Sequence, residues 1–165
     1  MSKGEMPEGR LTIEAMRHPG QPPAHTRVMA SLIALISGAI LLLSLGATTA
    51  SVLRPARAAF SLLCHGIEGR CFILDGTPMP VCARCIGIYG GAFLSAVMSL
   101  VRPRAGAGGS HAILPILAIL PVAIDGATQA LGMRESTNLL RVATGAFAGV
   151  LLTWWIVQKS AMKSK

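Results

Sequence analysis

Four cysteines and a histidine within one short stretch of the chain are the side chains best suited to chemistry. Cys64 and His65 are adjacent, and Cys82 and Cys85 form a CxxC pair at the start of an apolar segment. Thiolates and imidazoles are preferred ligands of Zn²⁺. We therefore predict a Zn²⁺ site whose ligands are Cys64, His65, Cys82 and Cys85. Cys71 is the substitute if adjacent residues cannot both reach the ion.

The same cysteines admit two other interpretations. A CxxC pair at the amino terminus of a helix is typical of thiols with a lowered pKa, which suit thiol–disulfide exchange, and an extracytoplasmic location permits disulfides. Alternatively, two disulfides would only fix the cysteine-rich loop to the helix that follows. The number of potential ligands favours zinc over both. Arg84, inside the CxxC pair, is placed to favour a thiolate, to bind an anion, or simply to extend to the membrane interface.

The composition indicates a membrane protein. The 165 residues have room for one domain, and 52% of them are apolar while 13% are charged, whereas a soluble domain usually carries about 25% charge. The net charge of +8 is spread over segments that flank apolar runs, without a dense basic face or interleaved aromatic residues. This pattern is typical of membrane orientation and anionic headgroups, so membrane lipids are the expected partners and nucleic acid is not.

Four apolar segments are long enough to cross a bilayer as helices, since about 20 residues cover ~30 Å of hydrocarbon. They are residues 28–50, 81–101, 112–131 and 138–158. The first ends in small residues, as a secretory signal does, but its apolar core is longer than the usual ~15 residues, which favours a retained helix. The predicted fold is an all-α integral membrane helical bundle with about four transmembrane helices and a cysteine-rich interfacial loop.

The segments outside the spans complete the expected organisation. Residues 1–27 form a mobile basic tail and residues 159–165 a second basic tail. Between them lies a membrane domain at 28–158, which contains the cysteine-rich loop at 54–80. Residues 51–63 carry two arginines beside an apolar set, which predicts a helix lying in the interface. Four spans place both termini on one side. That side carries nine basic residues against six on the other, which predicts cytoplasmic termini and an extracytoplasmic cysteine loop in the cell membrane.

Polar side chains inside the third and fourth spans form a second candidate site. Asp125 and Gln129 are four residues apart and share one helix face. In a tight hairpin Asp125 lies opposite Arg141, so their side chains are expected to pair, and Gln129 lies opposite Asn138. Charges within hydrocarbon cost several kcal/mol and usually have a partner. One interpretation is therefore a structural ion pair with amides that hydrogen-bond between helices.

The other interpretation is a polar cleft that opens toward the cysteine loop. Asp125 is then the candidate catalytic acid or base, and the candidate substrate-binding residues are Gln129, Arg134, Asn138, Arg141 and Arg84. So many hydrogen-bonding side chains exceed what one ion pair needs, which favours the cleft. Its chemistry suits the anionic or carbonyl-bearing headgroup of a lipid or isoprenoid, polarised by the metal or by metal-bound water.

Small residues predict how two of the spans pack. GxxxG patterns occur at residues 87–91 of the second span and 145–149 of the fourth. Glycines at this spacing let helix backbones approach closely. Contact between these helices would bring the CxxC pair alongside Asn138 and Arg141.

Two separated motifs resemble a known family. The first is the Cys64–His65 pair with PVCARCIGIYGG at 80–91, and the second is DGATQALGMRESTNLLRVATG at 125–145. Over about residues 60–150 the chain resembles the small multi-pass membrane family called domain of unknown function 2085. The resemblance implies a membrane protein whose signature positions are Cys64, His65, Cys82, Arg84 and Cys85. Cys71 stands where this family would lead us to expect serine or another polar residue, which argues against Cys71 as a ligand.

Three functions are consistent with these residues, and the family name supplies no reaction. The first is an enzyme that acts on a lipid or isoprenoid headgroup. The second is a non-enzymatic membrane binding or transport-accessory protein in which zinc only folds the loop. The third is thiol exchange with a quinone or a partner protein.

Overall fold

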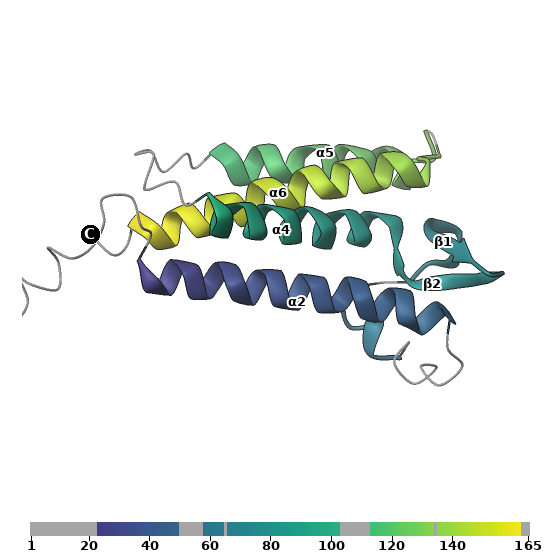
Figure 1. The fold of residues 1–165 in the computed structure, drawn as a ribbon. Helices are drawn as coiled ribbons and strands as arrows, with labels where there is room; N and C mark the ends of the chain where they lie inside the picture. Colours follow the sequence, from purple (N-terminus) through teal and green to yellow (C-terminus); the bar gives the residue numbers. More distant parts are fainter. Residues whose placement is uncertain (1–22, 50–57, 65, 103–112, 134, 163–165) are drawn as a thin grey trace, which may run out of the picture.

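The computed structural model describes residues 23–49, 58–64, 66–102, 113–133 and 135–162. Within them four helices are long and apolar enough to cross a membrane: α2 (Ala24–Thr49), α4 (Ala83–Val101), α5 (Ile113–Ala130) and α6 (Asn138–Met162). They lie side by side in the order α2, α4, α6, α5 (Figure 1). The predicted all-α membrane bundle is confirmed. Helices α2 and α6 also extend into the segments expected to be tails, of which 1–22 and 163–165 lie outside the described residues.

The connection between α5 and α6 is tight because both helix ends are capped. At the end of α5, Gly132 has a φ of 67°, a conformation that favours glycine, and the Met133 N–H donates to the Thr128 carbonyl at 3.0 Å. At the start of α6, the Leu140 N–H donates to Thr137 Oγ1 at 3.3 Å, as expected of an N-cap threonine. The two helices therefore form a hairpin, which sets their polar residues at neighbouring heights.

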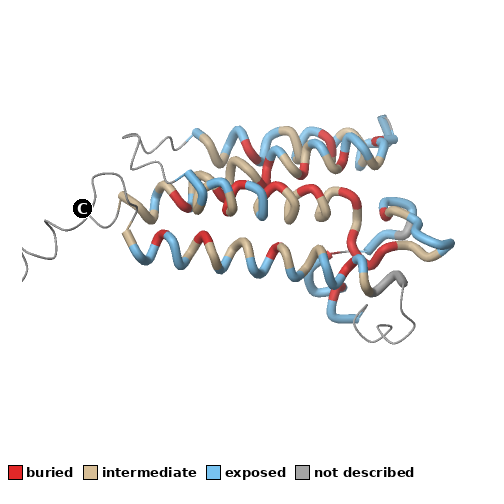
Figure 2. Tube along the Cα trace, viewed as in Figure 1, coloured by how far each residue is buried: buried red, intermediate tan, exposed pale blue. Residues whose placement is uncertain are grey.

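Figure 2 shows which positions of the helices are buried and which are exposed. The buried positions are mostly small residues, and many of the exposed ones are large aliphatic residues. The buried set includes Ala30, Ser37, Ser44, Ala83, Ser95, Ala96, Ala118 and Ala148. The exposed set includes Leu32, Leu35, Ile36, Leu42, Leu94, Ile116, Ile119, Ile124 and Leu139. Lipid chains are as apolar as leucine, so burying leucine between helices gains little in a bilayer, whereas small residues let helices pack closely.

Helices α4 and α6 pack backbone to backbone where both GxxxG patterns lie. A Cβ added at Gly87 would lie 2.9 Å from the Ala146 backbone nitrogen, and one at Gly149 would lie 2.9 Å from the Ala92 nitrogen. Neither helix has room for even one methyl group at these positions. The predicted contact between the second and fourth spans is confirmed.

Adding that methyl group should destabilise the bundle. Gly87→Ala is expected to lower the thermal unfolding temperature in detergent by several degrees, because overpacking costs about 1–3 kcal/mol and each 1 kcal/mol shifts a chain of this size by ~2–4 °C. Gly90→Ala is the matched control, since a Cβ there meets nothing within 4 Å. It should leave the unfolding temperature unchanged or raise it, because alanine favours helix over glycine. Equal unfolding temperatures for the two variants would contradict the packing argument.

Between α2 and α4 the chain forms a β-hairpin where the sequence analysis expected a loop. Strand β1 (Cys71–Leu74) follows the short 3₁₀ helix η2 (Glu68–Arg70) and pairs antiparallel with β2 (Thr77–Cys82). The hairpin forms because Asp75 and Gly76 turn the chain with φ values of 49° and 73°, as in a primed two-residue turn. Strand β2 ends where α4 begins, so the hairpin delivers Cys82 to the bundle. Of the predicted interfacial helix, residues 51–57 lie outside the described residues and 58–60 form one helical turn.

Candidate metal centre and polar network

Three thiols meet at the end of the bundle that carries the hairpin. The Sγ atoms of Cys64, Cys82 and Cys85 all lie within 4.8 Å of one another. Each comes from a different element: Cys64 follows the helical turn at 58–60, Cys82 ends β2, and Cys85 lies in the first turn of α4. Tetrahedral zinc with bonds of about 2.3 Å requires sulfur atoms ~3.8 Å apart, so movements of ~1 Å would let this set fit zinc.

The thiols sit in an apolar cluster that limits their contact with water. Phe60, Cys64 and Val81 are buried, and the side chains packed against them are Ile40, Cys82, Cys85, Ile86 and Tyr89. The Cys82 N–H donates to Cys64 Sγ at 3.2 Å. A hydrogen bond from Cys85 outweighs burial and lowers the pKa of Cys82, which immediately precedes the spanning helix, from 9.0 to about 5. This lowering favours the thiolate of Cys82, the form that binds metals.

The other two candidate ligands stand apart from this set. Cys71 lies opposite Cys82 in the hairpin, but its Sγ donates to the Ile67 carbonyl at 3.3 Å and it is not a member of the thiol cluster. His65 lies outside the described residues. All four cysteines are described, and no disulfide joins any two of them.

Arg84, inside the CxxC pair, links the thiols to the acid of α5. Its guanidinium forms an ion pair with the Asp125 carboxylate, and the two side chains are 20% and 4% exposed. The expectation that Arg141 would be this partner is corrected. Arg141 is the only arginine that the α5–α6 hairpin itself brings opposite Asp125 among the described residues, whereas in the bundle the long Arg84 side chain reaches across from α4. The guanidinium also lies beside Gly126, where an added Cβ would be in ordinary contact with Arg84 Nη1 at 3.9 Å.

Arg141 instead holds together the amides of both hairpin helices. It donates to Asn138 Oδ1 at 2.9 Å and to Gln129 Oε1 at 3.0 Å. Gln129 Nε2 in turn donates to the Asp125 carbonyl at 2.8 Å, and Asn138 Nδ2 donates to the Cys71 carbonyl at 3.3 Å. One chain of hydrogen bonds therefore joins the β-hairpin, α6 and α5, and it ends at the backbone of Asp125.

Arg84 and Arg141 each have one buried N–H donor that makes no hydrogen bond to the described residues. The Nε atoms of Arg84 and Arg141 are buried, and neither has a hydrogen-bond partner among the described residues. A buried donor without an acceptor costs about 1–3 kcal/mol. The described side chains therefore leave these two donors unsatisfied.

A groove on the outer surface reaches the acid from the side. It has a volume of about 340 Å³ and is lined by Leu120, Pro121, Ile124, Asp125, Thr128, Leu140 and Thr144. The hydroxyls of Thr128 and Thr144 donate to carbonyls of their own helices, so the groove is largely apolar apart from the carboxylate. Because Ile124 and Leu140 are exposed on the outer faces of α5 and α6, the groove opens toward lipid. This groove cannot be predicted from the sequence, since it depends on how the helices pack.

The end of the bundle that carries the thiols thus also carries most of the predicted polar residues. Gly145 of α6 packs against α4 at the CxxC pair, since an added Cβ would lie 3.1 Å from the Ile88 nitrogen and 3.2 Å from the Arg84 carbonyl carbon. Arg134 lies outside the described residues. The members that the structure brings to this end are Cys64, Cys82, Cys85, Arg84, Asp125, Gln129, Asn138 and Arg141.

Comparison with known proteins places the chain among membrane proteins. A family model described as "Predicted membrane protein (DUF2085)" matches residues 64–155. An uncharacterised protein of Methanocaldococcus jannaschii is 38% identical over 101 residues, which cover 61% of this chain and 65% of that protein. An uncharacterised protein of Methanothermobacter thermautotrophicus is 41% identical over 91 residues, covering 55% of this chain and 81% of that protein. The chain therefore aligns with just under two thirds of the first relative's length. No solved structure matches it.

Proposed function

The chain belongs to the DUF2085 family of predicted membrane proteins, and on this premise we propose that it is a zinc-dependent membrane enzyme that acts on the polar headgroup of a lipid or isoprenoid. One observation carries the proposal. Arg84 lies between Cys82 and Cys85 in the sequence and forms an ion pair with the buried Asp125. A metal held by those thiols would therefore be bound by the same turn of chain that supplies the arginine paired with the intramembrane acid.

Cys64, Cys82 and Cys85 would hold the ion. Bound zinc supplies a Lewis acid and lowers the pKa of a bound water. The fourth tetrahedral position distinguishes two kinds of site: His65, adjacent to Cys64 in sequence, would close it in a structural site, whereas a substrate oxygen or water would take it in a catalytic one.

The remaining residues would bind and orient the headgroup. The buried Nε donors of Arg84 and Arg141 suit an anionic or carbonyl oxygen. Gln129 and Asn138 hold Arg141 in place by accepting from its two terminal nitrogens, and Arg134 is proposed as a further cation. Asp125 would give or take a proton at the headgroup. The apolar groove beside it would hold the hydrocarbon chain.

The test is conversion of a lipid by the purified protein. Wild-type protein in nanodiscs made from total membrane lipids should deplete one lipid class and accumulate a product, as followed by mass spectrometry. Asp125→Asn should slow this by a factor of about 10²–10⁴, the usual contribution of a general acid or base, while zinc stays bound. Asp75→Asn is the matched control, because it makes the same change in the exposed hairpin turn; its rate should equal wild type.

An unchanged rate in Asp125→Asn would exclude Asp125 as the acid or base. If zinc-bound wild-type protein converts no lipid, the second function is favoured, a binding or transport-accessory protein with structural zinc. The position of the thiols supports that alternative, because zinc there would join three chain segments inside the Phe60 and Val81 cluster. Metal-free protein with a reducible Cys82–Cys85 bond would instead favour thiol exchange.

A further inference from the structure

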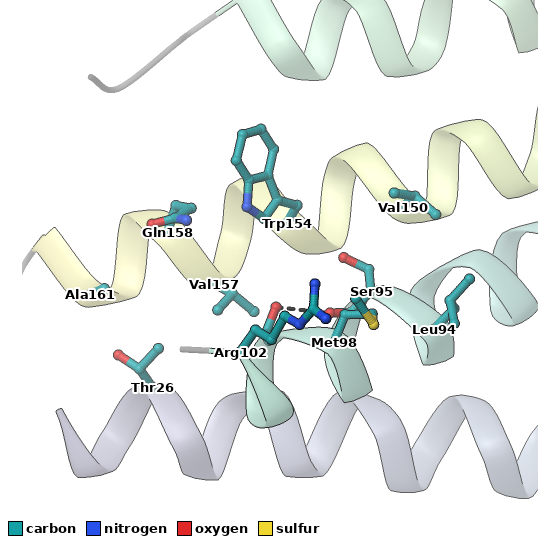
Figure 3. Close-up of a pocket in the computed structure, with 11 residues that line it drawn as sticks. Thr26, Leu94, Ser95, Met98, Arg102, Val150, Trp154, Val157, Gln158 and Ala161 are labelled. Carbon is teal, nitrogen blue, oxygen red and sulfur yellow. Dashed lines mark hydrogen bonds between the residues drawn. The ribbon is translucent and has the colours of Figure 1, made fainter. Parts of the chain in front are cut away.

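A second cavity lies at the opposite end of the bundle from the cysteines. It has a volume of about 310 Å³ and lies between the carboxyl-terminal halves of α4 and α6 and the first turn of α2 (Figure 3). At about 30 Å³ for a group the size of water, it has room for roughly ten such groups. None of its residues belongs to the metal centre or the polar network.

The shape of the cavity follows the helix axes. Its α4 wall runs from Leu94 to Arg102, which at 1.5 Å per residue is ~12 Å. Its sides are mostly apolar, from Leu94, Met98, Val150, Trp154 and Val157, with polar groups from Thr26, Ser95, Ser99 and Gln158. A slim hydrocarbon chain lying parallel to the helices, as lipid chains do, matches this shape.

The charged residues described at this end of the bundle are all basic. Arg102 lines the cavity at the residue after α4 and is exposed. The other charged residues described at this end, Arg27 and Lys159, are also basic. In the described part of the chain, every acid lies elsewhere: Glu68, Asp75 and Glu135 next to the hairpin or the α5–α6 connection, and Asp125 in α5. The mouth of the cavity therefore complements an anion.

We propose that this cavity binds an anionic phospholipid, with one acyl chain between α4 and α6 and its phosphate on Arg102. Arginine binds phosphate through paired N–H donors, which gives the site a preference over zwitterionic lipids of the same chain length. Trp154 lines the cavity and would contact the chain. The site is independent of the proposed headgroup chemistry at the other end.

Tryptophan fluorescence tests the proposal, because the sequence contains only two tryptophans, Trp154 and Trp155. In Trp155→Phe protein, Trp154 is the sole reporter. Nanodiscs of phosphatidylcholine would contain an equal small fraction of brominated-chain phosphatidylglycerol or brominated-chain phosphatidylcholine. Brominated phosphatidylglycerol should quench Trp154 several-fold more strongly, and the Trp154→Phe variant, which reports Trp155, should show less of this difference.

Three variants separate the site from general surface charge. Arg102→Gln should weaken apparent binding of the anionic lipid about tenfold, since it removes a charged hydrogen bond. Arg27→Gln, the same change at an exposed position outside the cavity, should have little effect. Ser99→Leu should fill the cavity and reduce quenching by both lipids. Native mass spectrometry of phosphatidylglycerol retained in detergent gives a second readout that does not need the tryptophan variants.

Several outcomes would overturn the proposal. Equal quenching of Trp154 by the two brominated lipids would exclude a selective site. A preference that survives Arg102→Gln, or that Arg27→Gln abolishes equally, would assign it to the overall basic charge. No quenching of Trp154 by either lipid would show that something other than a lipid chain fills the cavity.

Discussion

Replacing Cys85 with serine should empty the metal site, whereas the same change at Cys71 should leave it filled. Wild-type protein should carry about one zinc ion per chain after gel filtration with a weak chelator, measured by mass spectrometry of the metal. Cys85→Ser should retain less than about a tenth of it, because one of three clustered thiolates is lost. Cys71→Ser should carry as much zinc as wild type, since the Cys71 thiol donates a hydrogen bond to a backbone carbonyl outside the cluster.

Two further variants sharpen this result. Cys82→Ser should behave as Cys85→Ser, which guards against an individual variant that fails to fold. His65→Ala distinguishes a closed four-ligand site from one with three thiolates, because zinc should be lost in the first case and retained in the second. Metal-free wild-type protein, or equal loss of zinc in Cys71→Ser, would contradict the assignment of the site.

Removing the guanidinium of Arg84 should be among the most destabilising single changes in the bundle. Arg84→Leu leaves the Asp125 carboxylate, which is 4% exposed, facing an apolar side chain. Breaking a buried ion pair costs about 3–5 kcal/mol of unfolding free energy. We expect a value near the lower limit, because the Arg84 side chain is 20% exposed to solvent. Asp125→Asn should cost less, since the amide is neutral and can still accept from Arg84. Unfolding in a denaturing detergent, followed by tryptophan fluorescence, measures the difference.

A double variant separates the ion pair from the packing of its side chains. Arg84→Leu with Asp125→Leu should recover most of the lost stability, because replacing both charges by apolar groups is often neutral. Arg70→Leu is the matched control, an exposed arginine beside the hairpin, and should change stability by less than about 0.5 kcal/mol. Additive effects of the two single changes would show that the residues do not interact.

The sequence predicted the pairing of α4 with α6 but not the partner of Asp125. The first could be predicted because GxxxG spacing acts through the backbone, so that Gly87 and Gly149 imply close contact whatever the partner helix. The second depends on which helices lie close enough for one side chain to bridge. A hairpin of α5 and α6 alone places Arg141 opposite Asp125, whereas the bundle order of α2, α4, α6, α5 lets Arg84 reach α5.

The metal centre shows a similar limit. The thiols of Cys64, Cys82 and Cys85 could be predicted to converge, because ligand type and CxxC spacing constrain them. The β-hairpin that carries Cys71 differs from the expected loop, although Asp75 and Gly76 carry the usual signal for a two-residue hairpin turn. The apolar groove beside Asp125 could not be predicted, since it is formed by side chains from two helices.

The small-residue interior also inverts the usual relation between hydrophobicity and tolerance to substitution. In a water-soluble domain, replacing a leucine by another aliphatic residue lowers stability most at buried positions in the core. Here Leu35, Leu42 and Ile116 face outward, so their replacement by valine or isoleucine should be nearly silent in a bilayer. Buried alanine, serine and glycine positions such as Ala83, Ser44 and Gly87 should not tolerate larger side chains. Drift among relatives should therefore accumulate at the most hydrophobic positions and spare the smallest.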